Sequence, residues 1–332
     1  MDIIQSIKDK VRPHSRTVVL PETADDRILK AAHIILDEGF VNLILLGCPE
    51  SLRNRAREMS LNIERTIIID PATDARRVAF KNTILAKLGT KGVAKDLADQ
   101  MTQDPMYFGV LLVQSGEADA QVAGSLSDTA DVLRAGLRFI PLRPGIKRIS
   151  GAFLMISPRP ELGEDGVCLF ADCAVNPVLT PPQLASVAVE SARTFRLIMG
   201  CEPRVALLSF STRGSAEHEH VDRVREITRL AREMAPELAI DGEMQVDAAV
   251  IEAVGKRKAP DSAVAGRANV LIFPDLNSGN IGYKIAQRYG GCEAVGPIIQ
   301  GFSKPINDLS RGTTVNDIVS TVAISALQSL ED

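Results

Sequence analysis

Several residue types are scarce in this chain of 332 residues. Tryptophan is missing, aromatic residues make up only 4% of the chain, and the five cysteines form no C-x-x-C pair and no cluster with histidine. A structural zinc site is therefore not expected, because such sites are built from closely spaced Cys and His ligands. Scattered thiols are typical of proteins from a reducing compartment, so we expect a cytoplasmic protein.

Neither charge nor hydrophobicity is concentrated in one part of the chain. The 38 Lys and Arg residues are balanced by 42 Asp and Glu residues, and this net charge of -4 is not that of a general nucleic-acid binder. No segment approaches the roughly 20 uninterrupted apolar residues of a membrane span, and residues 1–16 lack a signal-peptide core. We expect no binding to nucleic acid and none to membranes.

The common nucleotide and hydrolase motifs are also missing. The sequence contains no GxxxxGK[ST] loop, no GxGxxG after an apolar strand, and no GxSxG elbow. These absences disfavour a Walker-type ATPase, a Rossmann dinucleotide site and a Ser-His-Asp hydrolase.

The first half of the chain alternates short apolar runs with amphipathic stretches. Apolar runs at residues 17–20, 43–46 and 66–69 predict buried strands, and the spacing of apolar residues over 25–38 predicts a helix. Repeated strand and helix with short turns is typical of an α/β protein with mainly parallel sheets flanked by helices.

The second half continues this pattern after a break at residues 141–147, where prolines and glycine interrupt the periodicity. Residues 148–157 and 167–172 predict two strands joined as a hairpin. The other predicted elements are strands at 205–209, 269–273 and 298–300 and helices at 181–199, 220–234, 281–289 and 314–330. A length of 332 residues fits two domains.

Four loops rich in glycine, hydroxyl and amide side chains follow apolar runs, at residues 124–129, 209–215, 277–280 and 307–312. In parallel sheets such loops line the ligand crevice and offer backbone N–H groups to anions, which indicates a phosphate-bearing substrate. The alternative is that Gly, Ser and Asn are ordinary turn residues here.

One cluster of residues indicates a more specific chemistry. Ser310 and Arg311 precede Gly312, and Asp317 lies in the first turn of the predicted terminal helix. Arginine supplies a planar donor fork for phosphate or an oxyanion, serine a hydroxyl donor, and aspartate a base. Spacing alone fits equally well an ordinary helix start with a solvent-facing Asp317.

Long stretches of the chain resemble the phosphate acetyltransferase (phosphotransacetylase) family, in its short catalytic form. The stretches are LPETADDRILKAA (20–32), DPMYFGVLLV (104–113), ADAQVAGSLSDTADVLR (118–134), LSFSTRGSAEHEHVDRV (208–224), DGEMQVDAAV (241–250), RKAPDSAVAGRANVLIFPDLNSGNIGYK (257–284) and GPIIQGFSKPINDLSRGTTVNDIV (296–319). Together they extend over nearly the whole sequence.

The resemblance implies reversible conversion of acetyl-CoA and phosphate to acetyl phosphate and CoA, without a metal or another cofactor. It also implies a two-lobed homodimer with its site in the interlobe cleft. The first lobe would comprise residues 1–145 with the returning segment 300–332, and the second residues 146–299.

The matching motifs also imply roles for individual residues. Asp317 would deprotonate the CoA thiol in a ternary complex, while Ser310 and Arg311 orient the acyl phosphate and stabilise charge. The residues expected to bind substrate or CoA are Arg27, Arg134, Ser127, Thr129 and Lys284.

The chain departs from the family at residues 86–92, AKLGTKG, where relatives commonly carry Leu-Arg-Lys-His-Lys-Gly. Leu88 therefore replaces an arginine that helps to hold CoA. Lys87 and Lys91 are the candidates to compensate, because a flexible lysine stem can reach a phosphate from a neighbouring position.

Three alternatives remain at this point. Phosphate butyryltransferase shares the fold and the mechanism but prefers a longer acyl chain. A metal-dependent hydroxyacid dehydrogenase has a similar two-lobed architecture but needs a nucleotide loop and a carboxylate cluster, which the sequence does not display. The non-enzyme alternative is a silent sensor of acetyl phosphate or CoA, against which the presence of Ser310, Arg311 and Asp317 argues.

Overall fold

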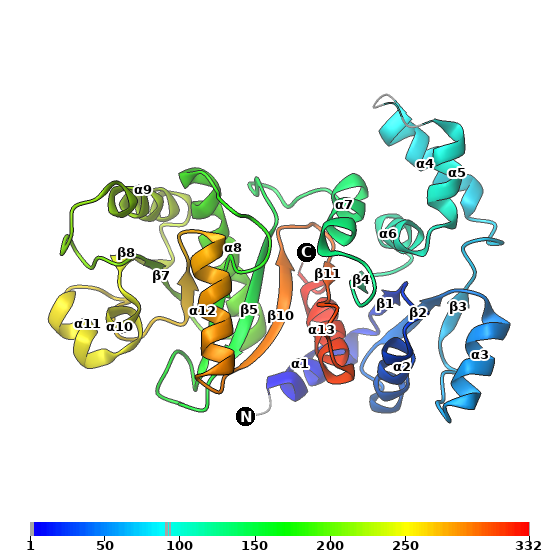
Figure 1. Ribbon diagram of the computed structural model, residues 1–332, viewed down its shortest axis with the longest axis horizontal. Helices are drawn as coiled ribbons and strands as arrows, with labels where there is room; N and C mark the ends of the chain where they lie inside the picture. Colours follow the sequence, from blue (N-terminus) through cyan, green and yellow to red (C-terminus); the bar gives the residue numbers. More distant parts are fainter. Residues whose placement is uncertain (1–2, 90–91, 93, 332) are drawn as a thin grey trace. The chain divides into compact units, whose positions relative to one another are not determined.

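The computed structural model describes residues 3–89, 92 and 94–331 and shows strands alternating with helices along the chain (Figure 1). Two units emerge: Met1–Pro141 with Phe302–Asp332, and Leu142–Gly301. The expected lobes, 1–145 with 300–332 and 146–299, differ from these units by a few residues at each boundary. The mixed α/β architecture agrees with the fold class expected from the sequence.

The first unit contains a five-stranded parallel sheet in the order β11-β4-β1-β2-β3. Its strands are β1 (Thr17–Leu20), β2 (Asn42–Leu46), β3 (Ile67–Ile69), β4 (Ala120–Ala123) and β11 (Ile306–Asp308). The strands predicted at 17–20, 43–46 and 66–69 are confirmed to within a residue or so. The inner strands β1 and β4 are almost entirely buried, as expected for strands with helices on both faces.

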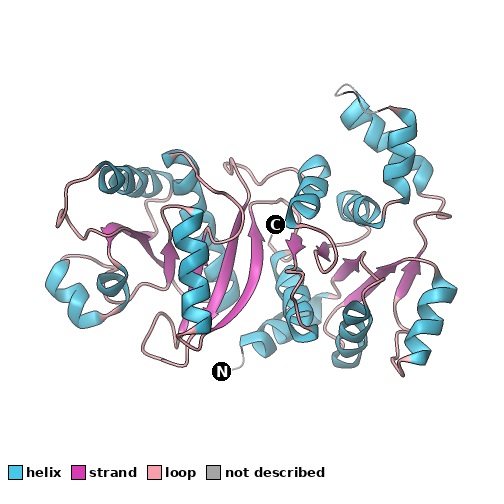
Figure 2. Ribbon diagram, viewed as in Figure 1, coloured by secondary structure: helices cyan, strands magenta, loops and turns pink. Residues whose placement is uncertain are grey.

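Helices cover both faces of this sheet (Figure 2). They are α1 (Ile3–Val11), α2 (Asp26–Glu38), α3 (Pro49–Glu58), α4 (Arg77–Leu88), α5 (Lys95–Gln103), α6 (Pro105–Ser115), α7 (Thr129–Phe139) and α13 (Val315–Gln328). The terminal helix α13 packs against α1, α2 and the strands β1 and β4. Its apolar side chains from Ile318 to Leu327 are buried, so the last segment of the chain supplies part of the first unit's core.

The second unit contains a six-stranded mixed sheet in the order β10-β5-β6-β9-β7-β8. Its strands are β5 (Ser150–Ile156), β6 (Val167–Ala171), β7 (Arg204–Leu208), β8 (Ala239–Met244), β9 (Val270–Ile272) and β10 (Glu293–Gln300). Strands β5 and β6 pair antiparallel, which confirms the predicted hairpin. Strand β10 pairs antiparallel with β5, while β6, β9, β7 and β8 run parallel.

The helices of the second unit are α8 (Pro181–Met199), α9 (Glu219–Met234), α10 (Val246–Val250), α11 (Glu252–Lys258) and α12 (Leu276–Arg288). Helix α8 begins after Thr180, whose backbone N–H donates to Gln183 Oε1 at 2.9 Å, and has prolines in its first turn, as its sequence predicts. No helix among the described residues combines the length and the apolar character that crossing a membrane requires.

Gly109 lets helix α6 approach the sheet of the first unit closely. A Cβ atom added there would overlap the side-chain oxygen of Gln121 on β4 and lie 3.0 Å from Val19 Cγ1 on β1. Both neighbours are fully buried and have little room to move.

We therefore expect Gly109→Ala to lower the free energy of unfolding by about 1–3 kcal/mol, as overpacked core substitutions typically do. Gly89→Ala is the matched control, because a Cβ at Gly89, after the last turn of α4, meets no atom within 4 Å. Urea unfolding of both variants measures the difference, and equal stabilities would show that α6 can shift to accommodate the methyl group.

Candidate active site

Three loops of the first unit meet at one edge of its parallel sheet. Loop 21–25 follows β1, loop 124–128 follows β4, and loop 309–314 follows β11, and these strands are neighbours in the sheet. The chain leaves β1 towards β2 on one side, while β4 lies on the other side, so the strand order reverses between β1 and β4. Ligand crevices of open parallel sheets form at such points.

Loop 124–128 is wrapped around the carboxylate of Glu22, a residue that the sequence analysis did not single out. Glu22 is buried, and its Oε2 accepts hydrogen bonds from Gly124 N at 2.6 Å, Ser125 N at 2.6 Å and Ser125 Oγ at 3.1 Å; its Oε1 accepts from Leu126 N at 3.3 Å and Ser127 N at 2.8 Å. We expected these N–H groups to face a substrate anion. That expectation is wrong for this loop, because an internal carboxylate already occupies its N–H groups.

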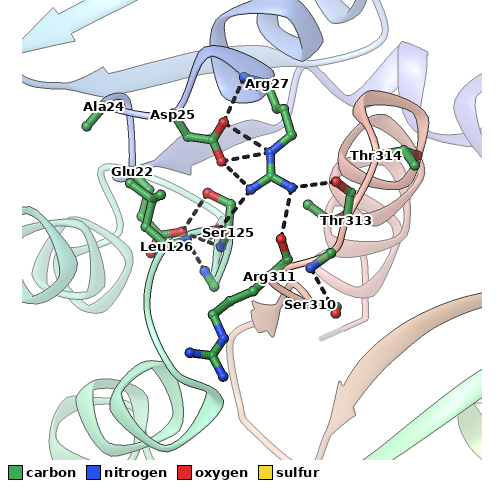
Figure 3. Close-up of polar contacts among 12 residues, drawn as sticks. Glu22, Ala24, Asp25, Arg27, Ser125, Leu126, Ser310, Arg311, Thr313 and Thr314 are labelled. Carbon is green, nitrogen blue, oxygen red and sulfur yellow. Dashed lines mark hydrogen bonds and ion pairs between the residues drawn. The ribbon is translucent and has the colours of Figure 1, made fainter.

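Arg27 joins all three loops (Figure 3). Its Nε and one terminal nitrogen bind Asp25, that nitrogen also donates to Ser125 O at 3.0 Å, and the other terminal nitrogen donates to Arg311 O at 3.0 Å and Thr313 O at 2.7 Å. Every nitrogen of the guanidinium thus has a protein partner. Arg27 therefore lies beside the segment that carries Arg311, but its guanidinium hydrogen-bonds to the loops and not to an open space for substrate.

The Asp25–Arg27 pair is electrostatically stable. Burial alone would raise the pKa of Asp25, but the hydrogen bonds from Arg27 outweigh burial, so this pKa lies below its usual value. The hydrogen bond to Asp25 raises the pKa of Arg27 in turn. Both groups therefore stay charged around neutral pH, and the connection between the loops persists.

Ser310 and Arg311 lie at the exposed end of this arrangement. The guanidinium of Arg311 contacts Asp128 Oδ1 at 3.1 Å, with 73% of the arginine side chain and 63% of the aspartate side chain exposed. Ser310 Oγ accepts a hydrogen bond from Gly312 N at 3.3 Å. An exposed ion pair of this kind contributes little to stability, so a phosphate group can replace Asp128 as the partner of Arg311 at small cost.

Asp317 is the third residue of α13 and forms a capping box with Thr314. Its Oδ2 accepts hydrogen bonds from Thr314 N and Thr314 Oγ1, both at 2.8 Å, and its own N–H donates to Thr314 Oγ1 at 3.2 Å. The helix start that we considered as the alternative is therefore present. Oδ1 has no hydrogen-bond partner among the described residues, and the side chain is exposed, so one oxygen caps the helix while the other is available as a base.

Arg134 lies in a separate pocket of about 530 Å³ in the same unit. The pocket is lined by Lys87, Leu88, Ala130, Leu133, Arg134, Leu137 and Arg138. Leu88, which the family resemblance implies stands in place of an arginine, is buried at this pocket. Lys87 Nζ donates to Phe139 O at 2.8 Å, so this candidate replacement is anchored to the end of α7. Lys91 lies outside the described residues, and compensation by the two lysines stays a prediction.

The remaining predicted positions belong to the second unit. Lys284 is exposed on α12, with its Nζ 5.8 Å from the ring centre of Tyr283. In loop 209–215, Gly214 N donates to Glu243 Oε1 at 2.8 Å, and at the start of α12, Ser278 N donates to Asp275 Oδ1 at 2.8 Å. The predicted loop 277–280 lies within the first turns of α12 and is not a loop. Both segments, like loop 124–128, use N–H groups that were predicted to face a substrate to bind carboxylates of the chain itself.

The family profile for phosphate acetyl/butaryl transferase matches residues 2–326. The chain belongs to this family.

Similar proteins agree with this assignment over the full chain. A phosphate acetyltransferase from Thermoanaerobacterium thermosaccharolyticum is 48% identical over 99% of this chain and 100% of its own length. The crystal structure of a phosphotransacetylase from Streptococcus pyogenes has a TM-score of 0.94 and 42% identity, covering 99% of this chain and 98% of the other. A 4-hydroxythreonine-4-phosphate dehydrogenase from Klebsiella pneumoniae, 14% identical with a TM-score of 0.52 over 96% of this chain and 100% of its own, shares only the fold.

A second buried carboxyl group lies beneath the site of this family member. Asp308, at the end of β11, is 1% exposed; Thr129 Oγ1 donates to its Oδ2 at 2.5 Å, and no described residue hydrogen-bonds its Oδ1. Burial, with a further contribution from the charge of Glu22, raises the pKa of Asp308 to about 7. Thr129, which is expected to bind substrate, thus donates its hydroxyl hydrogen bond to a buried carboxyl group whose pKa lies near neutral pH.

This shift predicts a pH-dependent stability. Between the ordinary pKa near 3.8 and about 7, folded Asp308 retains a proton that the unfolded chain has released. The free energy of unfolding therefore falls as pH rises through this range, and it levels off above about 7. Asn mimics the protonated acid. Between pH 5 and pH 8 the native chain should therefore lose up to about 3 kcal/mol of stability that Asp308→Asn does not lose.

Urea unfolding at both pH values measures this effect, and Asp261→Asn, in an exposed loop of the second unit, is the control. An identical pH dependence for the native chain and Asp308→Asn would show that Asp308 does not carry the titration.

Proposed function

We propose that this chain transfers an acetyl group between CoA and phosphate in a ternary complex, with Asp317 as the base and Ser310 and Arg311 at the reacting acyl phosphate. The observation that carries this mechanism is the segment from Ser310 to Asp317, which joins loop 309–314 to the first turn of α13. It places an exposed serine hydroxyl, an exposed guanidinium and a carboxylate with an unpaired oxygen within one short segment. The identities of 40–48% to relatives named phosphate acetyltransferase support the activity itself.

Each residue has a separate task in this mechanism. Oδ1 of Asp317 takes the proton of the CoA thiol, because a free thiol with a pKa of about 8.5 is mostly protonated at neutral pH. The thiolate sulfur attacks the carbonyl carbon of acetyl phosphate, and the bond between that carbon and the phosphate oxygen breaks. Arg311 and Ser310 donate hydrogen bonds to the negative charge on the carbonyl and the departing phosphate.

The other expected residues support binding. We propose that Arg134, which lines its pocket from α7, binds a phosphate of CoA, and that Ser127, Thr129 and Lys284 contribute hydrogen bonds to the substrates. Arg27 shapes the site through its contacts with the loops. The reaction as written needs no metal or redox cofactor, because the substrates supply both the nucleophile and the leaving group.

We further propose a cytoplasmic homodimer. Ile281 and Ile285 of α12 and Tyr289 directly after it follow at helical spacing, and 56%, 54% and 91% of these residues are exposed. The same helix borders a mainly apolar pocket of about 520 Å³, around which Val178 and Phe210 are also exposed. An apolar surface of this kind usually marks a protein interface, and a second copy of the chain is the partner that we propose.

The activity is tested by following thioester absorbance when acetyl phosphate and CoA are mixed with the protein in metal-free buffer. We expect thioester to form, and to form faster than with butyryl phosphate at equal concentration. A preference for butyryl phosphate would identify the phosphate butyryltransferase alternative, and no thioester from either would favour the sensor.

Asp317→Asn is expected to lower turnover at pH 7 at least about a hundredfold, because general-base help is worth about 10² to 10⁴ in rate. Asn retains an oxygen that can accept the hydrogen bond from Thr314 N, so urea unfolding should report a stability within about 1 kcal/mol of the native chain. The loss of turnover should shrink as pH approaches the thiol pKa. Native turnover at pH 7 would show that Asp317 is not the base.

Arg311→Gln is expected to reduce turnover about 10²- to 10³-fold and to weaken the binding of acetyl phosphate, with a much smaller effect on CoA. Gln keeps a donor but loses the charge and the bidentate fork. Arg229→Gln is the control, since Arg229 is an exposed arginine that pairs with Glu233 on α9. An equal rise in both Michaelis constants with unchanged turnover would place Arg311 away from the reacting centre.

A further inference from the structure

Four consecutive backbone N–H groups, those of residues 124–127, converge on the single carboxylate of Glu22. Successive N–H groups that point to one spot form a concave site for an anion, and such sites often hold phosphate. Here the chain supplies the anion itself, from the loop that follows β1. The donor residues and Glu22 are about a hundred residues apart in the sequence, so the contact joins two loops rather than closing a local turn.

The contacts continue from this anion to the segment that carries Ser310 and Arg311. Ser125 donates to Glu22 through its N–H and hydroxyl groups, and its carbonyl oxygen accepts from Arg27 at 3.0 Å. Arg27 in turn binds the carbonyl oxygens of Arg311 and Thr313, on either side of Gly312 (Figure 3). Asp128, which follows the four N–H groups, faces the guanidinium of Arg311 at 3.1 Å.

We propose that Glu22 is the positioning residue of the acyl-transfer site: its carboxylate fixes loop 124–128 and, through Ser125 and Arg27, sets the position of Ser310 and Arg311. Glu22 itself touches neither substrate. The kinetic part of this proposal depends on the proposed function, whereas the structural part does not.

The negative charge of Glu22 is essential to this role. Four N–H dipoles that point to one spot repel each other unless an anion lies between them, and charge-assisted hydrogen bonds to a carboxylate are about twice as strong as neutral ones. Glutamine at this position would turn an NH2 group towards at least two of the N–H donors and take away their acceptor. The neutral side chain therefore cannot reproduce the loop, although it has nearly the same shape.

The experiment compares Glu22→Gln and Glu22→Ala with the native chain by steady-state kinetics and by hydrogen exchange of the substrate-free protein. We expect the turnover number of Glu22→Gln to fall about a hundredfold, because misplacement of reacting groups by about 1 Å has that effect, while both Michaelis constants stay within about threefold. Amide exchange should become faster in peptides that cover residues 124–128 and 309–314.

Chemical rescue separates positioning from general destabilisation. In Glu22→Ala the four N–H groups lose their anion, and formate is small enough to replace the missing carboxylate. Added formate should therefore increase the turnover of Glu22→Ala in a saturable manner and slow exchange at residues 124–128. Asp104→Asn is the matched control, because Asp104 also binds a backbone N–H in this unit, that of Met106 at 2.8 Å, but caps α6. It should show native kinetics and no response to formate, as should the native chain.

The proposal is overturned if Glu22→Gln raises a Michaelis constant about tenfold or more with native turnover, because Glu22 would then act in binding. Native turnover with native exchange at 309–314 overturns it as well, and so does a loss of turnover without faster exchange and without formate rescue. If Glu22→Ala does not fold, Glu22→Gln and its exchange decide. Failure of the native chain to form thioester would count against the proposed function alone, since exchange is measured without substrate.

Discussion

A buried negative charge at the end of the first strand shapes the site of this chain. The carboxylate of Glu22 accepts hydrogen bonds from the N–H groups of residues 124–127, and those of Gly124 and Ser125 would otherwise be buried without acceptors. Arg27, held in turn by Asp25, transmits that arrangement to the loop after β11. Charged side chains of the chain itself therefore hold together the loops at which parallel sheets often bind phosphate, while Ser310 and Arg311 stay exposed.

Most strands could be predicted from the sequence because apolar runs mark them. Strands β4, β8 and β11 could not, since polar residues interrupt their runs: Gln121 in β4, Asp241 and Glu243 in β8, and Asn307 in β11 are all buried. Asn307, for example, donates to Ser325 Oγ and Gln328 Oε1, both at 2.7 Å, on the terminal helix. A polar residue in the sequence predicts an exposed position. Its burial depends on a hydrogen-bond partner that lies on another element, and the local sequence does not show that partner.

The candidate site likewise contains residues that the sequence indicates and residues that it does not. Ser310, Arg311 and Asp317 lie within eight residues, so their spacing and the family resemblance could indicate them together. Glu22 and Asp308 act on partners 102 or more residues away, and no local pattern marks such contacts. The signal that was present for Glu22 is its place directly after Pro21, where the first buried strand ends and a loop of a parallel sheet begins. A charged residue directly after a buried strand of a parallel sheet can therefore indicate a site, as a glycine-rich motif does.

The return of the chain to its first unit has a consequence for the order in which the protein matures on the ribosome. Strand β11 and helix α13 follow the whole of Leu142–Gly301 in the chain. The second unit is continuous and can fold as soon as it emerges, whereas the first waits with an unpaired edge on β4 and an uncovered apolar face. Until residues 302–328 emerge, that unit offers its open edge to other chains, and molecular chaperones are its natural protection during synthesis.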